Sequence, residues 1–286
     1  MLLATHLQNI PPAKLAEGPV WDYRTNTLWW VDILKGNLHS YHIESAIQKT
    51  YELGQYLGAV VPCENESTNL IIASYDGFAL YNTTTGITQK LSNPEKELPL
   101  NRFNDGKCDK KGRFWAGTME IEPQNPEGNL YCFSKGVSTK KLENIYISNG
   151  LEWSLDQTKM YYIDTLTHKL QVFDYDLESG SIKNGKDAIV FEKSLGSPDG
   201  MTMDENENLW ICFYGGSKVC CFNPITGKEL KRIIVPTTCP TSCAFGGKNM
   251  NTLFITSAAN EDEILGGSLF SINLDVKGIK TNFYQQ

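Results

Sequence analysis

The amino-acid sequence predicts an all-β fold, namely a six-bladed β-propeller around a central channel. Three observations support this prediction. Apolar runs rich in aromatic and β-branched residues recur six times, turn-forming glycines are spread along the whole chain, and no stretch shows the sustained 3.6-residue periodicity of a helix. A repeat of about 40–50 residues that contains several short strands is typical of a propeller blade.

The six apolar runs begin 42, 43, 47, 49 and 44 residues apart. They occupy residues 28–31, 70–73, 113–116, 160–163, 209–212 and 253–256. A second run, which ends in an aromatic strand in most repeats, follows at residues 38–41, 78–81, 130–133, 170–173, 219–222 and 269–272. A single four-stranded sheet cannot bury both of its faces, so neighbouring blades are expected to cover each other in a closed ring.

The ring needs a closing contact between the two ends of the chain. We expect residues 4–7 to provide it by pairing with the blade that also contains residues 242–284. The chain of 286 residues has no linker and no low-complexity segment. Residues 1–286 are therefore predicted to form one six-bladed propeller domain, a size within the range of all-β domains.

Composition excludes several classes of partner. The net charge of −7 argues against nucleic acid and anionic membranes, because both select basic surfaces. The first residues lack a basic region, and no run reaches the roughly 18 apolar residues of a membrane span, so we expect a cytoplasmic protein. We also expect a monomer or a weak homo-oligomer. The eight cysteines form no Cys-x-x-Cys pair and are predicted to be buried thiols.

The repeat also aligns a set of residues that lie about ten positions before each apolar run. In a propeller this alignment predicts a ring of side chains around one mouth of the channel. The six residues in this register are Glu17, Ala59, Asn104, Asn149, Asp199 and Ser242. Their donor atoms are oxygens, with no imidazole and no thiolate.

Two interpretations of this ring remain open from the spacing alone. Glu17 and Asp199 would repel each other across a narrow channel, and a divalent cation between them would remove that repulsion. Hard oxygen donors favour Ca²⁺, Mg²⁺ or Mn²⁺ and still admit Zn²⁺. Alternatively, Asn149-Gly150 and Asp199-Gly200 are ordinary turn dipeptides that a repeat protein would contain without any metal. Glu17 favours the metal, because glutamate is a poor turn residue.

Five short motifs, in order and at matching spacing, extend from about residue 15 to residue 258. They are Glu17-Gly18-Pro19 with Trp21-Asp22, Arg102-Phe103-Asn104-Asp105-Gly106-Lys107, Gly112 to Met119, Ser148-Asn149-Gly150-Leu151 and Pro198-Asp199-Gly200-Met201. Together they strongly resemble the senescence-marker-protein / gluconolactonase / luciferin-regenerating-enzyme family, the regucalcin-like proteins. This resemblance implies a six-bladed propeller with one divalent metal ion at the channel mouth.

The same resemblance implies roles for individual residues. Glu17, Asn149 and Asp199 would hold the metal ion, with Ca²⁺ as the first choice and Zn²⁺, Mg²⁺ or Mn²⁺ as alternatives. Arg102, Asn104 and Glu122 would contact the substrate. The loop after Met119 departs from the family pattern, because it is shorter than the lid of the animal lactonases. The transfer of a substrate contact to Glu122 is therefore the weakest of these assignments.

The expected function is hydrolysis of a sugar-type lactone, a small molecule whose ester ring is opened. The metal ion would polarise the carbonyl, and Asp199 would act as general base toward water. Arg102 and Asn104 would orient the substrate. No Gly-x-Ser-x-Gly motif supports a serine hydrolase. The alternatives are a non-catalytic calcium-binding regulator, an interaction propeller, and luciferin-regenerating-type hydrolysis of a non-sugar substrate.

Overall fold

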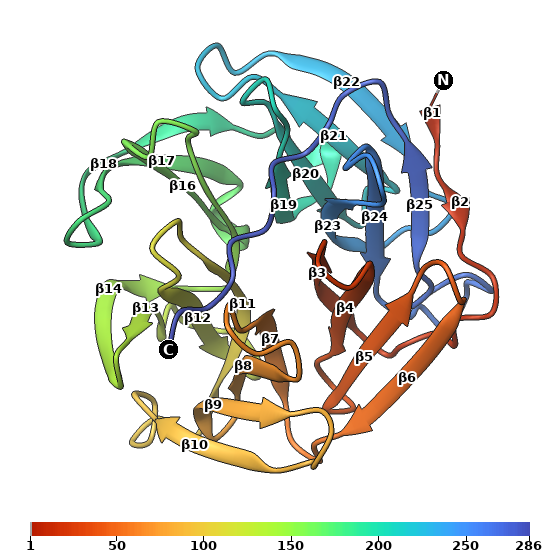
Figure 1. The fold of residues 1–286 in the computed structure, drawn as a ribbon. Coiled ribbons are helices and arrows are strands. Elements are labelled where there is room, and N and C mark those ends of the chain that lie inside the picture. The colour runs from red at the N-terminus through yellow and green to blue at the C-terminus, as the bar shows by residue number, and fades with distance from the viewer. Residues whose placement is uncertain (1) are drawn as a thin grey trace.

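The computed structural model describes residues 2–286, which fold almost entirely into β-strands. The strands form six sheets arranged around a central axis, as Figure 1 shows from one end of that axis. The predicted six-bladed β-propeller is therefore confirmed. No helix among the described residues is long and apolar enough to cross a membrane.

The first three blades follow one another directly along the chain. Blade one contains β3 (Ala16–Asp22), β4 (Thr27–Asp32), β5 (Asn37–His42) and β6 (Ile47–Glu52). Blade two contains β7 (Leu57–Pro62), β8 (Asn69–Ser74), β9 (Gly77–Asn82) and β10 (Thr88–Ser92). Blade three contains β11 (Asn101–Cys108), β12 (Phe114–Glu120), β13 (Gly128–Ser134) and β14 (Val137–Ile145).

The other three blades include the two short 3₁₀ helices and both strands of the N-terminal segment. Blade four contains β15 (Ser148–Trp153), β16 (Lys159–Asp164), η1 (Thr165–Thr167), β17 (Lys169–Asp176) and β18 (Ser181–Val190). Blade five contains β19 (Ser197–Met203), β20 (Leu209–Tyr214), β21 (Lys218–Phe222), β22 (Glu229–Ile234) and β1 (Leu2–Leu3), with η2 (Lys193–Leu195) before it. Blade six contains β23 (Pro240–Gly246), β24 (Thr252–Ser257), β25 (Phe270–Asn273) and β2 (Thr5–His6).

The ring closes as the sequence predicts. Strand β2 supplies the outermost strand of blade six, where Thr5 pairs with Ser271 and His6 with Phe270 in antiparallel register. The strand before it adds a contact that the sequence does not reveal, because β1 pairs in parallel with β22 of blade five. The beginning of the chain therefore joins two neighbouring blades.

One detail of the predicted strand order is wrong. Registering the repeats on the apolar runs takes these runs as the first, channel-lining strands. They instead form the second strand of each blade, and the ring residues lie inside a separate inner strand. The reason is that inner strands such as β11 carry Asn104, Asp105 and Gly106 instead of an apolar alternation. Polar side chains face the channel there, so hydrophobic periodicity does not mark these strands.

Large aromatic side chains fill the space within and between blades. Trp115, Trp153 and Trp210 are at most 1 % exposed. The indole nitrogens of Trp115 and Trp210 donate hydrogen bonds to Asp109 and Asp204, which sit in the turn after the inner strand. All eight cysteines are free and buried, which confirms the prediction of buried thiols.

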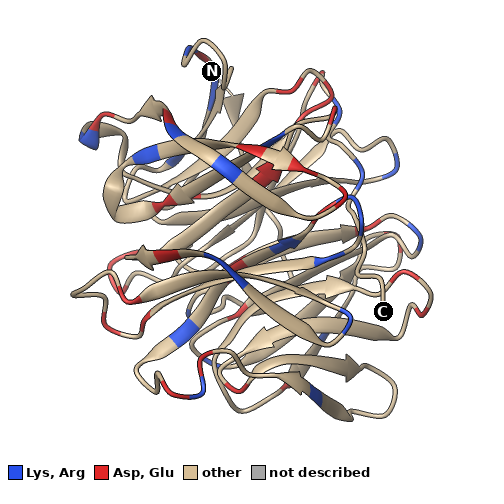
Figure 2. Cartoon of the chain, turned by 90° about the vertical axis from the view of Figure 1, so that its left-hand side faces the viewer, with Lys and Arg blue, Asp and Glu red and all other residues tan. Residues whose placement is uncertain are grey.

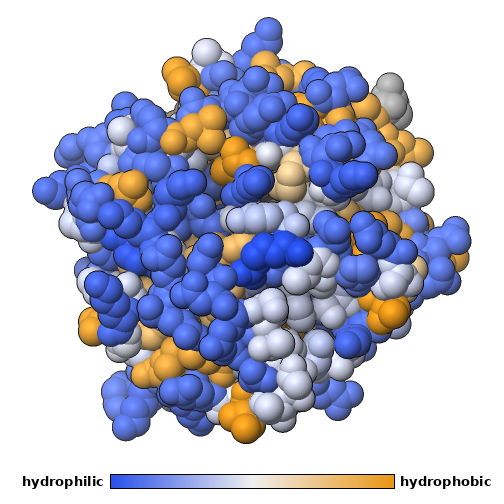
Figure 3. Space-filling model, viewed as in Figure 1, coloured by the Kyte–Doolittle hydropathy of each residue, from blue (hydrophilic) through white to orange (hydrophobic). Residues whose placement is uncertain are grey.

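Residues 277–286, here called the C-terminal strap, run across the end of the channel that faces the viewer in Figure 1. Backbone hydrogen bonds tie the strap to blade five through Lys277, to blade two through Tyr284 and to blade three through Gln285. The same face is mostly hydrophilic, with only scattered hydrophobic atoms (Figure 3). Acidic and basic residues are interspersed over the side seen in Figure 2.

Candidate metal centre and substrate cavity

A cavity of about 300 Å³ opens at the end of the channel opposite the C-terminal strap. Five of the six predicted site residues line it. The complete lining consists of Leu15, Glu17, Arg102, Asn104, Met119, Ile147, Asn149, Thr165, Leu166, Ser197, Asp199 and Tyr214. The inner strands therefore bring together residues that lie far apart in the sequence.

A β-bulge lies at the ring position of every inner strand. The pairing register shifts between Glu17 and Val20, Leu57 and Ala59, Phe103 and Gly106, Asn149 and Leu151, Pro198 and Met201, and Pro240 and Cys243. A bulge re-aims a side chain that a regular pleat would point elsewhere. Six bulges at one level explain how the ring residues come to surround the mouth of the channel.

The glycines that follow the ring residues allow close packing of neighbouring inner strands. A Cβ atom on Gly200 would lie 2.1 Å from the hydroxyl oxygen of Ser242, and one on Gly150 would lie 2.9 Å from the backbone oxygen of Asp199. Both dipeptides, Asn149-Gly150 and Asp199-Gly200, lie within strands. The interpretation of these dipeptides as turns is therefore wrong.

Asn149 is held so that its oxygen is left without a partner. Its amide nitrogen donates to the Thr165 hydroxyl at 2.9 Å, and that hydroxyl donates to the backbone oxygen of Pro198 at 2.9 Å. The Oδ1 atoms of Asn149 and Asp199 are both buried and accept no hydrogen bond. Buried oxygens without a donor are costly, and a bound cation would satisfy them.

The electrostatics of the ring also favour a bound cation. Burial is the main cause that raises the pKa of Glu17, and the nearby carboxylates of Asp199 and Asp105 raise it further. Burial and Asp105 likewise raise the pKa of Asp199. Asp199 and Asp105 thus oppose the ionisation of Glu17, and Asp105 opposes that of Asp199, in the absence of a cation.

The donor set suits a hard cation, although it contains few acidic groups. No cluster of three or more His, Cys, Asp or Glu side chains that could hold a metal occurs within residues 2–286. Glu17 and Asp199 supply only two acidic side chains, and the third oxygen donor of the candidate site is the amide of Asn149. All three side chains offer oxygen donors of the kind that Ca²⁺ and Mg²⁺ accept.

Thr165→Val is expected to weaken metal binding by about 10–100-fold, the usual effect of losing a group that orients a ligand. The reason is that Asn149 would lose the hydroxyl that fixes its amide. Titration of the chelator-treated protein with Ca²⁺ would measure the change, and Thr165→Ser should restore the affinity. Equal binding by Thr165→Val and the parent protein would contradict the proposed role of Asn149.

Arg102 and Asn104 form a fixed pair at the side of the cavity. Nη1 of Arg102 donates to Oδ1 of Asn104 at 2.8 Å and to the backbone oxygen of Phe103 at 3.0 Å. Nδ2 of Asn104 in turn donates to the backbone oxygen of Ser148 at 2.8 Å. Burial lowers the pKa of Arg102 to about 10, so the guanidinium still carries its charge at neutral pH.

A second polar group lies deeper in the channel. The Lys107 ammonium donates to Glu152 at 2.8 Å and to the backbone oxygen of Met201 at 2.9 Å. Burial raises the pKa of the neighbouring Asp105 to about 6, although Lys107 opposes that shift. A lysine at the end of a short polar motif is expected to be solvated, but Lys107 instead forms an ion pair with the buried Glu152.

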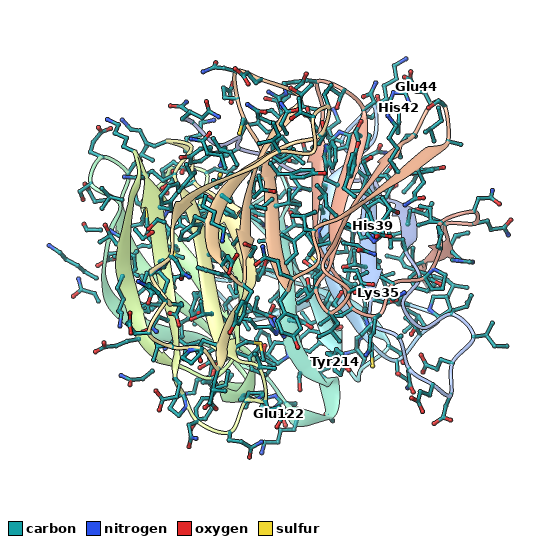
Figure 4. The ribbon with its side chains drawn as sticks, turned by 90° about the horizontal axis from the view of Figure 1, so that it is seen from below. Lys35, His39, His42, Glu44, Glu122 and Tyr214 are labelled. Atoms are coloured by element: carbon teal, nitrogen blue, oxygen red, sulfur yellow. The ribbon has the colours of Figure 1, made fainter. Side chains whose placement is uncertain are left out.

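Glu122 is the one predicted site residue that does not line the cavity. It is exposed on the loop between β12 and β13, at the lower edge of Figure 4. Tyr214 also lies in the lower part of that view and does line the cavity. Sequence reasoning misses Tyr214 and Thr165 because they fall outside the repeated motifs, and no local signal marks them.

Fold and site together define a class of protein: a six-bladed propeller with an oxygen-lined polar ring at the floor of a cavity. The family model described as SMP-30/Gluconolactonase/LRE-like region matches residues 15–259. The chain belongs to this family, as its motifs predicted.

Several relatives and solved structures are similar over nearly the whole chain. A Bacillus subtilis protein provisionally named sugar lactone lactonase YvrE is 36 % identical over 274 residues, which is 93 % of each chain. Regucalcin of Gallus gallus is 35 % identical over 280 residues, again 93 % of each chain. The structure of an Agrobacterium tumefaciens calcium-binding protein, regucalcin, has a TM-score of 0.94 at 28 % identity and covers 100 % of this chain and 99 % of its own. A luciferin-regenerating enzyme has a TM-score of 0.93 at 29 % identity, with 99 % of both chains covered.

Proposed function

We propose that this protein is a divalent-metal-dependent lactonase that opens the ester ring of a lactone, with sugar lactones as the reference substrates. The observation that carries the proposal is the pair of buried, unpartnered oxygens of Asn149 and Asp199 beside Glu17, at the floor of a cavity. The name of the Bacillus relative supports the reaction class. The calcium-binding protein from Agrobacterium, which has nearly the same fold, supports calcium as the first ion to test.

The charge balance of the channel supports one divalent cation. Four buried acidic side chains act on one another there, namely Glu17, Asp105, Glu152 and Asp199. Two basic side chains, Arg102 and Lys107, oppose them. With all six groups ionised, the excess of two negative charges equals the charge of one Ca²⁺, and leaving that excess buried without compensation would be unfavourable.

The reaction needs a polarised carbonyl, an activated water molecule and a proton for the leaving oxygen. A divalent cation held by Glu17, Asn149 and Asp199 would supply Lewis-acid polarisation of the carbonyl. Asp199 takes a proton from water as the water oxygen bonds to the carbonyl carbon. The ring C–O bond then breaks, and the same proton passes to the departing alkoxide, which gives the hydroxy acid.

Arg102 and Asn104 position the substrate. The contacts of Asn104 with Arg102 and Ser148 fix the amide before any ligand arrives, and such preorganisation reduces the entropy lost on binding. Glu122 joins this group only if the loop between β12 and β13 moves toward the cavity. Ser197, a further residue of the lining, offers a hydroxyl close to the ring.

Chelation is the first experiment that tests the proposal. Purified protein is expected to hydrolyse glucono-1,5-lactone, to lose that activity on treatment with a chelator, and to regain it when Ca²⁺, Mg²⁺, Mn²⁺ or Zn²⁺ is added back singly. The measurement is acid release at constant pH, with heat-treated protein as the background. Full activity in the presence of chelator would contradict metal dependence. A protein that binds Ca²⁺ but hydrolyses no lactone would instead support a calcium-binding regulator.

A further inference from the structure

The cavity has two chemically different halves. The floor is polar and contains four of the six ring residues, namely Glu17, Asn104, Asn149 and Asp199. The rest of the lining is largely apolar and contains Leu15, Met119, Ile147, Leu166 and the ring of Tyr214, here called the wall, beside the polar Thr165 and Ser197. Leu166 is 46 % exposed and Tyr214 40 % exposed, although both are large and mostly apolar. Exposed apolar surface beside a candidate active site indicates a binding surface.

Several polar groups near the wall already have partners inside the protein. The Thr165 hydroxyl accepts from Asn149 and donates to Pro198. The Asn104 amide uses both its oxygen and its nitrogen. Arg102 uses Nη1 twice, and within residues 2–286 its Nε and Nη2 donors make no hydrogen bond. Only part of their hydrogen-bonding capacity therefore remains for a ligand.

The loop between β12 and β13 adds no polar contact to the cavity. Oε2 of Glu120 accepts hydrogen bonds from the backbone nitrogens of Gln124 and Asn125, at 2.9 and 2.8 Å, so this carboxylate holds the loop itself. Glu122 is exposed and does not line the cavity. Ile121, between them, faces a neighbouring groove with Leu34, Tyr56 and Tyr75.

We propose that the apolar wall is a subsite for a hydrophobic substituent, so that the preferred substrate is a lactone with an alkyl or aryl chain rather than a polyhydroxylated one. This inference rests on the lactonase function proposed above. A sugar hydroxyl placed against Leu15, Met119 or Ile147 would lose its hydrogen bonds to water without replacement. Each methylene buried there instead improves binding by roughly three- to fourfold.

A series of δ-lactones tests the subsite directly. The substrates are δ-valerolactone, which has no side chain, δ-octalactone with three carbons, δ-decalactone with five, and glucono-1,5-lactone. We expect kcat/KM to rise with chain length and to reach at least about 30-fold for δ-decalactone over δ-valerolactone, which is less than full burial of five methylenes would give. Values of kcat/KM that do not change with chain length would overturn the proposal. So would a kcat/KM for glucono-1,5-lactone that is tenfold higher than that for δ-decalactone.

Two matched variants test whether the wall causes the rise of kcat/KM with chain length. Leu166→Gln replaces a wall residue that is 46 % exposed, and Leu230→Gln replaces a leucine that is 45 % exposed on the outer strand β22. We expect the ratio of kcat/KM for δ-decalactone over δ-valerolactone to fall about fivefold in Leu166→Gln and to stay constant in Leu230→Gln. Thermal unfolding of both variants shows whether the fold is retained.

The outcomes separate this inference from the function on which it rests. Suppose that lactones are hydrolysed, but that kcat/KM does not rise with chain length, or that the ratio of kcat/KM for δ-decalactone over δ-valerolactone is equal in Leu166→Gln and the parent protein. Either result would contradict the apolar subsite and still support the lactonase function. If no lactone in the series is hydrolysed with Ca²⁺, Mg²⁺, Mn²⁺ or Zn²⁺, both the proposed function and the inferred subsite are wrong.

Discussion

Asp199→Asn is expected to lower kcat/KM for lactone hydrolysis by at least about 10³-fold, the range lost with a general base. The substitution removes the base and replaces a charged candidate metal ligand with a neutral one. Steady-state hydrolysis of glucono-1,5-lactone and δ-decalactone at saturating Ca²⁺ measures the effect. Glu17→Gln should reduce metal affinity as well, but it leaves the base in place.

The same substitution is expected to stabilise the protein when no metal is bound. A carboxyl group whose pKa is raised by folding destabilises the native state at every pH above its unfolded pKa. Asparagine removes that cost, so Tm in the presence of chelator should rise, by roughly 2–4 °C for each kcal/mol gained. In excess Ca²⁺ the order should reverse, because only the parent protein binds the ion tightly.

Ser242→Ala is the control for disturbance of the ring. Ser242 occupies the ring position of blade six, is buried, and does not line the cavity. Its substitution should change neither kcat/KM nor the calcium dependence of Tm. Activity of Asp199→Asn within tenfold of the parent protein would show that Asp199 is not the base. If Asp199→Asn has a lower Tm than the parent protein in chelator, another group must compensate the charge of Asp199 in the parent protein.

The sequence predicted the blade count, the closing strand and the ring because these depend on repetition. Strands such as β4 and β16 have an apolar centre of four residues, and such centres recur at nearly constant intervals. Glu17, Asn149 and Asp199 keep the same distance from those strands, so one alignment finds all three. Their roles as ligands and base stay predictions, since they depend on an ion and a substrate.

Other features could not be predicted because no pattern in the sequence encodes them. A β-bulge interrupts the pairing of the inner strand β11 with β12 between Phe103 and Gly106. A bulge produces no periodic pattern of hydrophobic residues by which the sequence could reveal it. Thr165 reaches Asn149 from a 3₁₀ turn sixteen residues later, a contact that exists only after blade four has folded. The exposed position of Glu122 follows from the short loop that carries it, in which Glu120 holds the backbone.

Phe283→Ala in the C-terminal strap is expected to destabilise the protein by about 3–5 kcal/mol, the usual cost of deleting a buried phenylalanine. Phe283 is 2 % exposed, and its ring lies 5.0 Å from that of Tyr23 and 3.8 Å from the guanidinium carbon of Arg24. The substitution would leave a cavity and remove the cation–π contact. Tm should fall by roughly 6–20 °C.

The position of the strap explains why so short a segment matters. Its backbone bonds to blades two, three, five and six, while Thr281 donates to the backbone oxygen of Trp21 in blade one at 2.8 Å. Residues 277–286 therefore connect five blades at the channel end opposite the cavity, independently of the ring closure by β2. Loss of the Phe283 anchor should weaken all of these connections together, because a strap held at fewer points frays from its end.

Gln286→Ala provides the matched control, because Gln286 is exposed at the end of the same strap. Its substitution should change stability by no more than about 0.5 kcal/mol, as is usual for surface positions. Urea unfolding of both variants and the parent protein gives the difference. Because the strap covers the mouth opposite the cavity, Phe283→Ala should retain its kcat/KM below its Tm. Equal stability of the two variants would mean that the blades hold together without the strap, and a selective loss of activity would mean that the two mouths are coupled through the channel.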